Sequence, residues 1–223
     1  MRLLLLLTAL VFANPVAAQC RVALVLALDV SQSVDAREYR LQSNGVADAL
    51  TNPEIADLLL LMGGPIAASA FEWSGAQQRY LISDWQLLTE RPALESFAES
   101  IRSHQRGFQY GPTAIGSALE AAHTLLQTAP PCDRAVVDIS GDGPLNDGPS
   151  VSDVYDRLDF EGVTVNGLVV GGDTSPEITA FYYREVIRGP GAFVEVASDF
   201  EDYERAMIRK LRRELAMPLS RVE

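Results

Sequence analysis

The sequence is poor in the side chains that catalytic triads and zinc sites most often use. It contains only two cysteines and two histidines among 223 residues. Neither His104 nor His123 lies beside a serine or cysteine in a recognisable nucleophile motif. A triad needs a base in contact with its nucleophile, and zinc is bound mainly by histidine and cysteine. We therefore expect no catalytic residue and look for a site with oxygen ligands.

Long apolar stretches and nucleotide-binding motifs are also missing. The apolar run over residues 3–12 is shorter than the roughly 20 residues that a membrane span requires. The glycine-rich stretches 63–65 and 189–191 fit neither a Walker motif nor a dinucleotide-binding motif. The net charge is −12, with 18 basic against 30 acidic residues. This charge disfavours a nucleic-acid or anionic-lipid partner.

The first residues have the pattern of a secretory signal peptide. Arg2 precedes the apolar run, and small residues lead up to Ala18, where a signal peptidase would cut. We expect residues 1–18 to be the signal peptide and residues 19–223 to form a single domain, a size that can bury its own core. The predicted location is periplasmic or secreted, with no stable membrane insertion after cleavage.

The two cysteines, Cys20 and Cys132, each precede an apolar run that reads as a strand. In an oxidising compartment they are expected to form a structural disulfide. The alternative is that they are two unpaired small residues. A bond between them would close a loop of more than 100 residues, for which loop entropy gives about 4–5 kcal/mol.

Apolar periodicity predicts an α/β fold with a mostly parallel central sheet, helices on both faces and one antiparallel edge hairpin. Residues 22–28 form a continuous apolar run, typical of a strand covered on both faces. The short turn at Ser74-Gly75 favours a hairpin. Further strands are predicted at residues 66–73, 79–82, 134–140, 163–170 and 192–196. Helices are predicted at residues 35–50 and 53–61, along the stripes that begin at Leu94 and Ile115, after Pro176, and from Phe200 onward.

Two aspartates follow predicted strands at corresponding positions. Asp29 lies nine residues after Cys20, and Asp142 lies ten residues after Cys132. If the cysteines join the starts of two neighbouring parallel strands, both aspartates reach the same carboxyl edge. Ligands of such sheets bind at that edge.

Hydroxyl groups accompany these aspartates. Asp29-Val30-Ser31-Gln32-Ser33 places a carboxylate and two hydroxyls at alternating positions, and Thr113 follows a glycine and a proline. Mg²⁺ prefers oxygen ligands and needs only one or two carboxylates. The string by itself also fits an ordinary turn and helix cap.

Together, the three segments around Asp29, Thr113 and Asp142 resemble the von Willebrand factor A domain and its metal-ion-dependent adhesion site. The resemblance implies a Rossmann-like fold and a metal bound by Asp29, Ser31, Ser33, Thr113 and Asp142. The implied ion is Mg²⁺, with Mn²⁺ or Ca²⁺ as alternatives, and the implied partner is a protein that offers an acidic side chain. An exported bacterial branch of unknown function is more closely similar, through Glu72-Trp73-Ser74-Gly75, Ser140-Gly141-Asp142-Gly143-Pro144 and Arg188-Gly189-Pro190-Gly191-Ala192-Phe193.

Two alternatives to protein binding remain at this point: a metal-dependent hydrolase and a domain in which the metal is only structural. A hydrolase needs a general base near the ion, and only Asp138 and Asp173 are available beyond the ligands. Asp138, inside an apolar strand, is interpreted as a paired structural carboxylate, with support of the metal ligands as its alternative. Asp173 is expected at the rim of the binding edge. The acidic segment 142–159 is interpreted as a solvated loop and helix face, in preference to a second calcium site.

Overall fold

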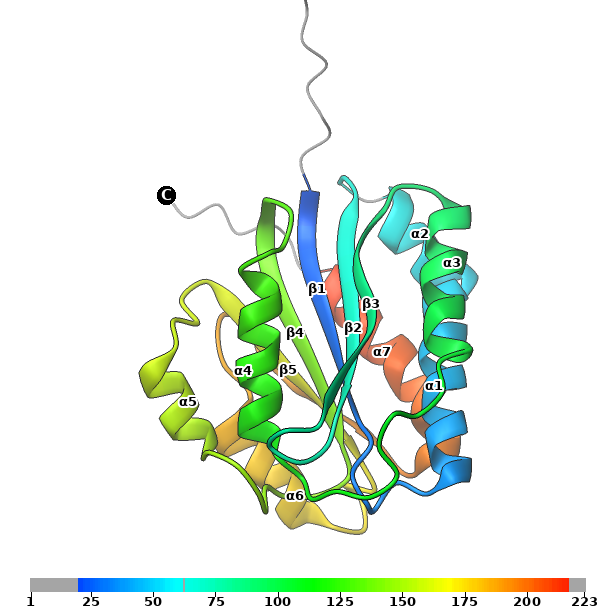
Figure 1. The fold of residues 1–223 in the computed structure, drawn as a ribbon. Coiled ribbons are helices and arrows are strands. Elements are labelled where there is room, and N and C mark those ends of the chain that lie inside the picture. The colour runs from blue at the N-terminus through cyan, green and yellow to red at the C-terminus, as the bar shows by residue number, and fades with distance from the viewer. Residues whose placement is uncertain (1–19, 62, 217–223) are drawn as a thin grey trace, which may run out of the picture.

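The central sheet has the predicted mostly parallel architecture. The computed structural model describes residues 20–61 and 63–216, so the predicted signal peptide lies outside the described residues. The strand order is β3-β2-β1-β4-β5-β6, and only β2 and β3 are antiparallel (Figure 1). The strands are β1 (Cys20–Asp29), β2 (Ile66–Trp73), β3 (Arg79–Leu88), β4 (Cys132–Gly141), β5 (Val163–Val170) and β6 (Val194–Ala197).

Helices cover both faces of the sheet, as Figure 1 shows. One layer packs into the first buried apolar cluster and contains α1 (Ala36–Thr51), α2 (Pro53–Leu61), α3 (Arg91–Arg102) and α7 (Tyr203–Leu215). The opposite layer contains α4 (Ile115–Leu126), α5 (Val151–Arg157) and α6 (Pro176–Phe181). Across residues 20–61 and 63–216, no helix combines the length and the apolar character that crossing a bilayer requires.

Strand β1 lies inside the sheet, between β2 and β4, and every one of its residues is buried. Its side chains alternate between the two cores: Leu24 and Leu26 pack with the first helical layer, and Val25 and Ala27 pack with the second. Full burial of a valine or leucine side chain contributes about 1.5–3 kcal/mol. The continuous apolar run therefore favours this inner position over an edge.

A disulfide joins the starts of β1 and β4. Cys20 and Cys132 are bonded, and they lie opposite each other in the strand register. Farther along the same pair of strands, Leu28 lies opposite Ser140. The prediction that these two strands are parallel neighbours is confirmed, and it brings Asp29 and Asp142 to one edge.

Helix α7 is fixed to the sheet by buried charges. The Lys210 ammonium is fully buried and forms ion pairs with Asp138 of β4 and with Glu214, one turn farther along α7. Asn166 of β5 donates a hydrogen bond of 2.6 Å to Glu214. Burial and the Glu214 carboxylate raise the pKa of Asp138 well above its usual range. Asp138 is therefore a paired structural carboxylate, as its sequence context favoured.

Several elements differ in extent from the sequence predictions. Strand β3 continues to Leu88, well beyond the predicted residues 79–82, because its pairing with β2 extends to Ile66 through register irregularities near Ala68 and Ala70. The helix that begins at Pro176 changes at Tyr182 into a π-helical turn, where the Ile187 amide donates to the Tyr182 carbonyl.

Candidate metal centre

The five predicted ligands lie at the carboxyl edge of the sheet. Asp29 is the last residue of β1, and Ser31 and Ser33 lie in the turn that leads to α1. Asp142 directly follows β4, and Thr113 lies in the loop between α3 and α4. Three chain segments that are far apart in sequence therefore meet where parallel sheets bind their ligands.

Hydrogen bonds connect four of these residues. The Ser31 amide donates to Asp29 Oδ1 at 2.7 Å, and the hydroxyls of Ser31 and Ser33 lie 3.1 Å apart. The Ser33 hydroxyl in turn donates to Asp142 Oδ1 at 2.6 Å. The turn after β1 is thus connected, through its hydroxyl groups, to the residue that follows β4.

Thr113 is held beside this group through its backbone. Its amide donates to Asn146 Oδ1 at 2.7 Å, and the Asn146 amide donates back to the Thr113 carbonyl at 3.0 Å. The Gln32 amide donates to the Gly111 carbonyl at 2.9 Å, which joins the two loops. A Cβ placed on Gly143 would lie 3.8 Å from the Thr113 hydroxyl. This hydroxyl therefore lies close to the segment that carries Asp142.

The electrostatics of the two aspartates favour a bound cation. Asp29 is fully buried, and its Oδ2 atom has no hydrogen-bond partner. Burial, reinforced by the Asp142 carboxylate, raises the pKa of Asp29 to about 7. Burial also raises the pKa of Asp142, although the hydrogen bond from Ser33 opposes this shift. A nearby cation would stabilise both carboxylates in their charged form.

The donor set fits a hard divalent ion. It offers two carboxylates and three hydroxyls, and Mg²⁺ takes such oxygen ligands together with water. Within the described residues, no three histidine, cysteine or acidic side chains group in a way that could hold a metal. The candidate site contains only two charged ligands, so the observation that indicates it is the unpartnered Asp29 Oδ2 atom with hydroxyl groups nearby.

Gly141 allows close packing at this edge. A Cβ at this position would lie 2.5 Å from the Tyr182 hydroxyl and 2.9 Å from Asp29 Oδ2. Both distances are too short for a side chain of any size. The Tyr182 hydroxyl is buried and also has no hydrogen-bond partner. The π-helical turn thus places a second unpartnered oxygen beside the candidate ligands, a feature that no sequence motif indicated.

Arg106 holds the turn that carries the serines, and sequence reasoning missed it. Its Nη2 donates to the carbonyls of Val30 at 2.7 Å and Ser31 at 3.0 Å. Its Nη1 donates to Val34 at 2.7 Å, and its Nε donates to Phe108 at 2.6 Å. The planar guanidinium suits such divergent acceptors. Because the contacts join residues more than 70 positions apart, no local motif could have identified this arginine.

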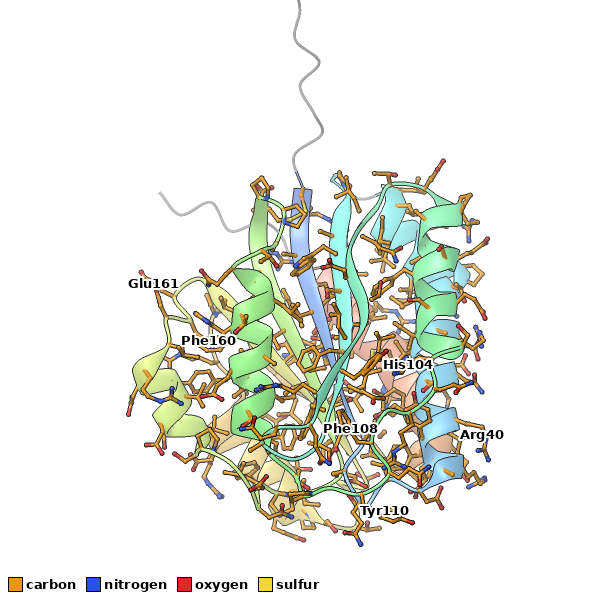
Figure 2. All side chains as sticks on the ribbon, viewed as in Figure 1. Arg40, His104, Phe108, Tyr110, Phe160 and Glu161 are labelled. Carbon is orange, nitrogen blue, oxygen red and sulfur yellow. A yellow bond between two sulfur atoms is a disulfide. The ribbon has the colours of Figure 1, made fainter. Side chains whose placement is uncertain are left out.

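Glu72 supports the loop that contains Arg106. It lies fully buried on β2, where its Oε1 accepts a hydrogen bond of 2.6 Å from the Gly107 amide. Its Oε2 approaches His104 Nε2 to 3.3 Å without hydrogen-bond geometry, and Figure 2 shows where His104 lies at the end of α3. Burial raises the pKa of Glu72 to about 7, although the Gly107 amide and Arg106 oppose this shift.

The remaining residues considered from the sequence are exposed or serve other contacts. Asp173 is exposed in the turn after β5. His123 packs its ring 5.4 Å from that of Phe160. Asp138 is occupied by its ion pair with Lys210. None of these groups supplies an evident base beside the candidate ligands.

Above the ligands the surface is hollowed. An open depression of about 830 Å³ covers the edge where the three loops meet. It is lined by Gln32, Ser33, Tyr110, Gly111, Pro112, Thr113 and Asn146. Two of the predicted ligands, Ser33 and Thr113, therefore face a space that another molecule could enter.

Comparison with known families shows the family of the chain. The model of a family described as proteins of unknown function, DUF1194, matches residues 19–219. The chain belongs to this family. For this DUF1194 member, a search of curated protein sequences finds no match.

Solved structures similar to this DUF1194 chain share its fold at low sequence identity. Proximal thread matrix protein 1 of the mussel byssus, solved with zinc in its metal-ion-dependent adhesion site, has 16% identity and a TM-score of 0.60, over 89% of this chain and 48% of that one. A von Willebrand factor type A protein from Catenulispora acidiphila has 14% identity and a TM-score of 0.57, with coverages of 86% and 42%. The pilus adhesin SpaC from Lactobacillus rhamnosus GG has 12% identity and a TM-score of 0.63, with coverages of 88% and 31%.

The DUF1194 chain therefore spans about half the length, or less, of these structures. The likeness shows that the fold is that of a von Willebrand factor A domain, as the sequence resemblance implied.

Proposed function

We propose that this chain is an exported, metal-dependent protein-binding module. In this proposal Asp29, Ser31, Ser33, Thr113 and Asp142 hold Mg²⁺, with Mn²⁺ or Ca²⁺ as alternative ions. When bound, the ion supplies a Lewis-acidic position that an acidic side chain of a partner protein can complete. The module comprises residues 19–223 after removal of the signal peptide, and it works in the periplasm or outside the cell.

The observation that carries the proposal is the unpartnered Asp29 Oδ2 atom. It is buried near a second carboxylate, Asp142, and among hydroxyls that can act as ligands without adding negative charge. A shell with only two carboxylates leaves the site attractive to a further anion. The depression lined by Ser33 and Thr113 gives such an anion access.

The disulfide supports the exported location. Bonds of this kind persist in oxidising compartments and are rare in the cytosol. The bond between Cys20 and Cys132 is therefore in keeping with the predicted signal peptide.

Metal binding is tested by thermal unfolding in the presence of increasing Mg²⁺. At a concentration 100 times the dissociation constant, binding to the folded state adds about 2.7 kcal/mol. For a domain of this size, we expect the melting temperature to rise by about 5–10 °C. Asp29→Asn should abolish the rise, whereas Asp173→Asn, at an exposed aspartate after β5, should keep it. An absence of any rise in the unmodified protein would contradict the metal site.

Protein binding is tested by capture from periplasmic extract with and without a chelator. A partner that is released by the chelator and not retained by Asp29→Asn supports the proposal. Retention in the presence of chelator contradicts the metal-dependent mechanism.

A hydrolase receives less support from the structure, because Asp138 is engaged by Lys210 and Asp173 is exposed. A panel of ester and phosphate substrates with metal-dependent turnover would reverse this conclusion.

A further inference from the structure

A second depression adjoins the one above the metal ligands. It has a volume of about 610 Å³ and lies between the start of α1 and the loop that follows α3. Gln32 and Tyr110 line both depressions, so the two form a continuous surface across these residues. The second depression is lined by Gln32, Val34, Asp35, Ala36, Tyr39, Arg40, Gln105, Arg106, Gln109 and Tyr110.

This neighbouring depression is positive in a strongly acidic protein. It contains the guanidinium groups of Arg40 and Arg106 against one carboxylate, Asp35, whereas the whole chain carries a net charge of −12. The Asp35 Oδ1 atom already accepts hydrogen bonds from the Arg37 and Glu38 amides at the start of α1. The local charge therefore favours an anionic ligand.

Arg40 is the side chain that can form an ion pair with such a ligand. It is exposed and forms no ion pair within the described residues, and its interaction with Asp35 in the same depression is electrostatic only. Arg106 differs, because its guanidinium is engaged by backbone carbonyls. Figure 2 places Arg40 on α1 and Tyr110 on the loop after α3, both toward the end of the molecule where β1 ends.

Tyr110 forms a fixed aromatic contact point between the depressions. Its side chain is 74% exposed, and its loop is held on both sides. The Gln78 amide group donates to the Tyr110 carbonyl at 3.1 Å, and the Gln32 amide donates to the next carbonyl, that of Gly111. Exposed tyrosines on fixed backbone are typical anchors of protein interfaces, because they lose little conformational entropy on binding.

We propose that the partner segment is an extended acidic peptide with two carboxylates, one directed to the metal centre and the other paired with Arg40, with the chain between them lying over Tyr110. This inference rests on the proposed function, because it extends the same carboxylate-binding edge. It adds a specificity determinant that is independent of the metal ligands. Partners with one acidic residue bind at the edge, and partners with two bind more tightly.

The test uses capped synthetic peptides, which have no terminal carboxylate. One set contains a single glutamate in a Gly/Ser background, and the other contains two glutamates separated by one to four Gly/Ser residues. Their affinities for the full chain in saturating Mg²⁺ are measured by NMR titration. For at least one spacing we expect the second glutamate to tighten binding by about two- to fivefold, the range for an exposed ion pair.

Matched variants identify the groups responsible. Arg40→Gln should bring the affinity ratio between two-glutamate and one-glutamate peptides close to one. Arg91→Gln, at an exposed arginine at the start of α3 and the opposite end of the sheet, should keep the full ratio. Tyr110→Ala should weaken all peptides, whereas Tyr183→Ala, at an exposed tyrosine that lines neither depression, should not.

The possible failures are distinguishable. If one-glutamate peptides bind with Mg²⁺ but the second glutamate adds nothing at any spacing, this inference is wrong and the proposed function stands. The same holds if Arg40→Gln retains the gain. If Mg²⁺ binds but no peptide does, the carboxylate step of the proposed function fails as well.

Discussion

The buried Glu72 carboxyl should make the stability of the protein depend on pH. In the folded state its pKa is raised from the ordinary value of 4.5 to about 7. Below pH 4.5 the group is protonated in both the folded and unfolded states and changes nothing. Between pH 4.5 and 7 the unfolded chain releases the proton while the folded chain keeps it, so stability falls as pH rises. Above pH 7 the full loss is present.

The magnitude follows from the size of this shift. A shift from 4.5 to about 7 corresponds to about 3 kcal/mol. Burial lowers the pKa of the neighbouring His104, which favours its neutral form, so the imidazole offsets little of this penalty. Glu72→Gln removes the titration, and its amide oxygen can still accept the hydrogen bond from Gly107. The difference in the free energy of unfolding between this variant and the unmodified protein should therefore grow by about 2–3 kcal/mol from pH 5 to pH 8.

Urea unfolding followed by tryptophan fluorescence at several pH values measures this difference. Asp29, whose pKa is also raised to about 7, contributes equally to both proteins, so subtraction isolates Glu72. Glu95→Gln, at an exposed glutamate of α3, controls for the substitution itself. A difference between Glu72→Gln and the unmodified protein that stays constant from pH 5 to pH 8 would refute the reasoning.

Three further perturbations test the site and its scaffold. Arg106→Lys keeps the charge but loses the planar donors that reach four carbonyls. Urea unfolding should therefore show a loss of stability of about 1–3 kcal/mol, and calorimetry should show a weaker Mg²⁺ affinity. An unchanged affinity would show that these hydrogen bonds of Arg106 do not shape the metal site. Gly141→Ala should destabilise the protein by about 1–3 kcal/mol because its Cβ has no space, whereas Gly143→Ala, with its nearest atom at 3.8 Å, should change the unfolding midpoint little. Replacing Cys20 and Cys132 together by serine removes the disulfide, whose cysteines are 112 positions apart, and should lower the free energy of unfolding by about 3–5 kcal/mol. A reductant should destabilise the unmodified protein by a similar amount and leave the variant unchanged.

Sequence reasoning succeeded where a structural feature has a local pattern. The apolar run before Asp29 and the run before Asp142 each predict a buried strand, and the matching distances to Cys20 and Cys132 align these strands in register. The observed pairing of Cys20 with Cys132 confirms that alignment. Because side-chain direction follows directly from strand register, the convergence of the two aspartates could be anticipated.

It failed where a feature depends on contacts between distant segments. Arg106 and Glu72 carry no local signal, since their roles arise only when the loop after α3 folds over the turn after β1. Lys210 is a related case, because the need for a partner to Asp138 could be predicted but the identity of that partner could not. The π-helical turn begins at Tyr182, whose hydroxyl lies against Gly141, and no residue pattern expresses this arrangement.

The buried ion pairs of α7 limit how this helix can move. Sliding by one helical turn would displace Lys210 by about 5.4 Å from Asp138. Asp138 would then be buried without its cation, while Lys210 would keep only Glu214 of its own helix, and breaking a buried pair costs about 3–5 kcal/mol. The helix therefore has one favoured position against the sheet and does not slide along its own axis. We expect binding at the metal edge to leave α7 in place, so the backbone amide chemical shifts of this helix should change little when Mg²⁺ and an acidic peptide are added.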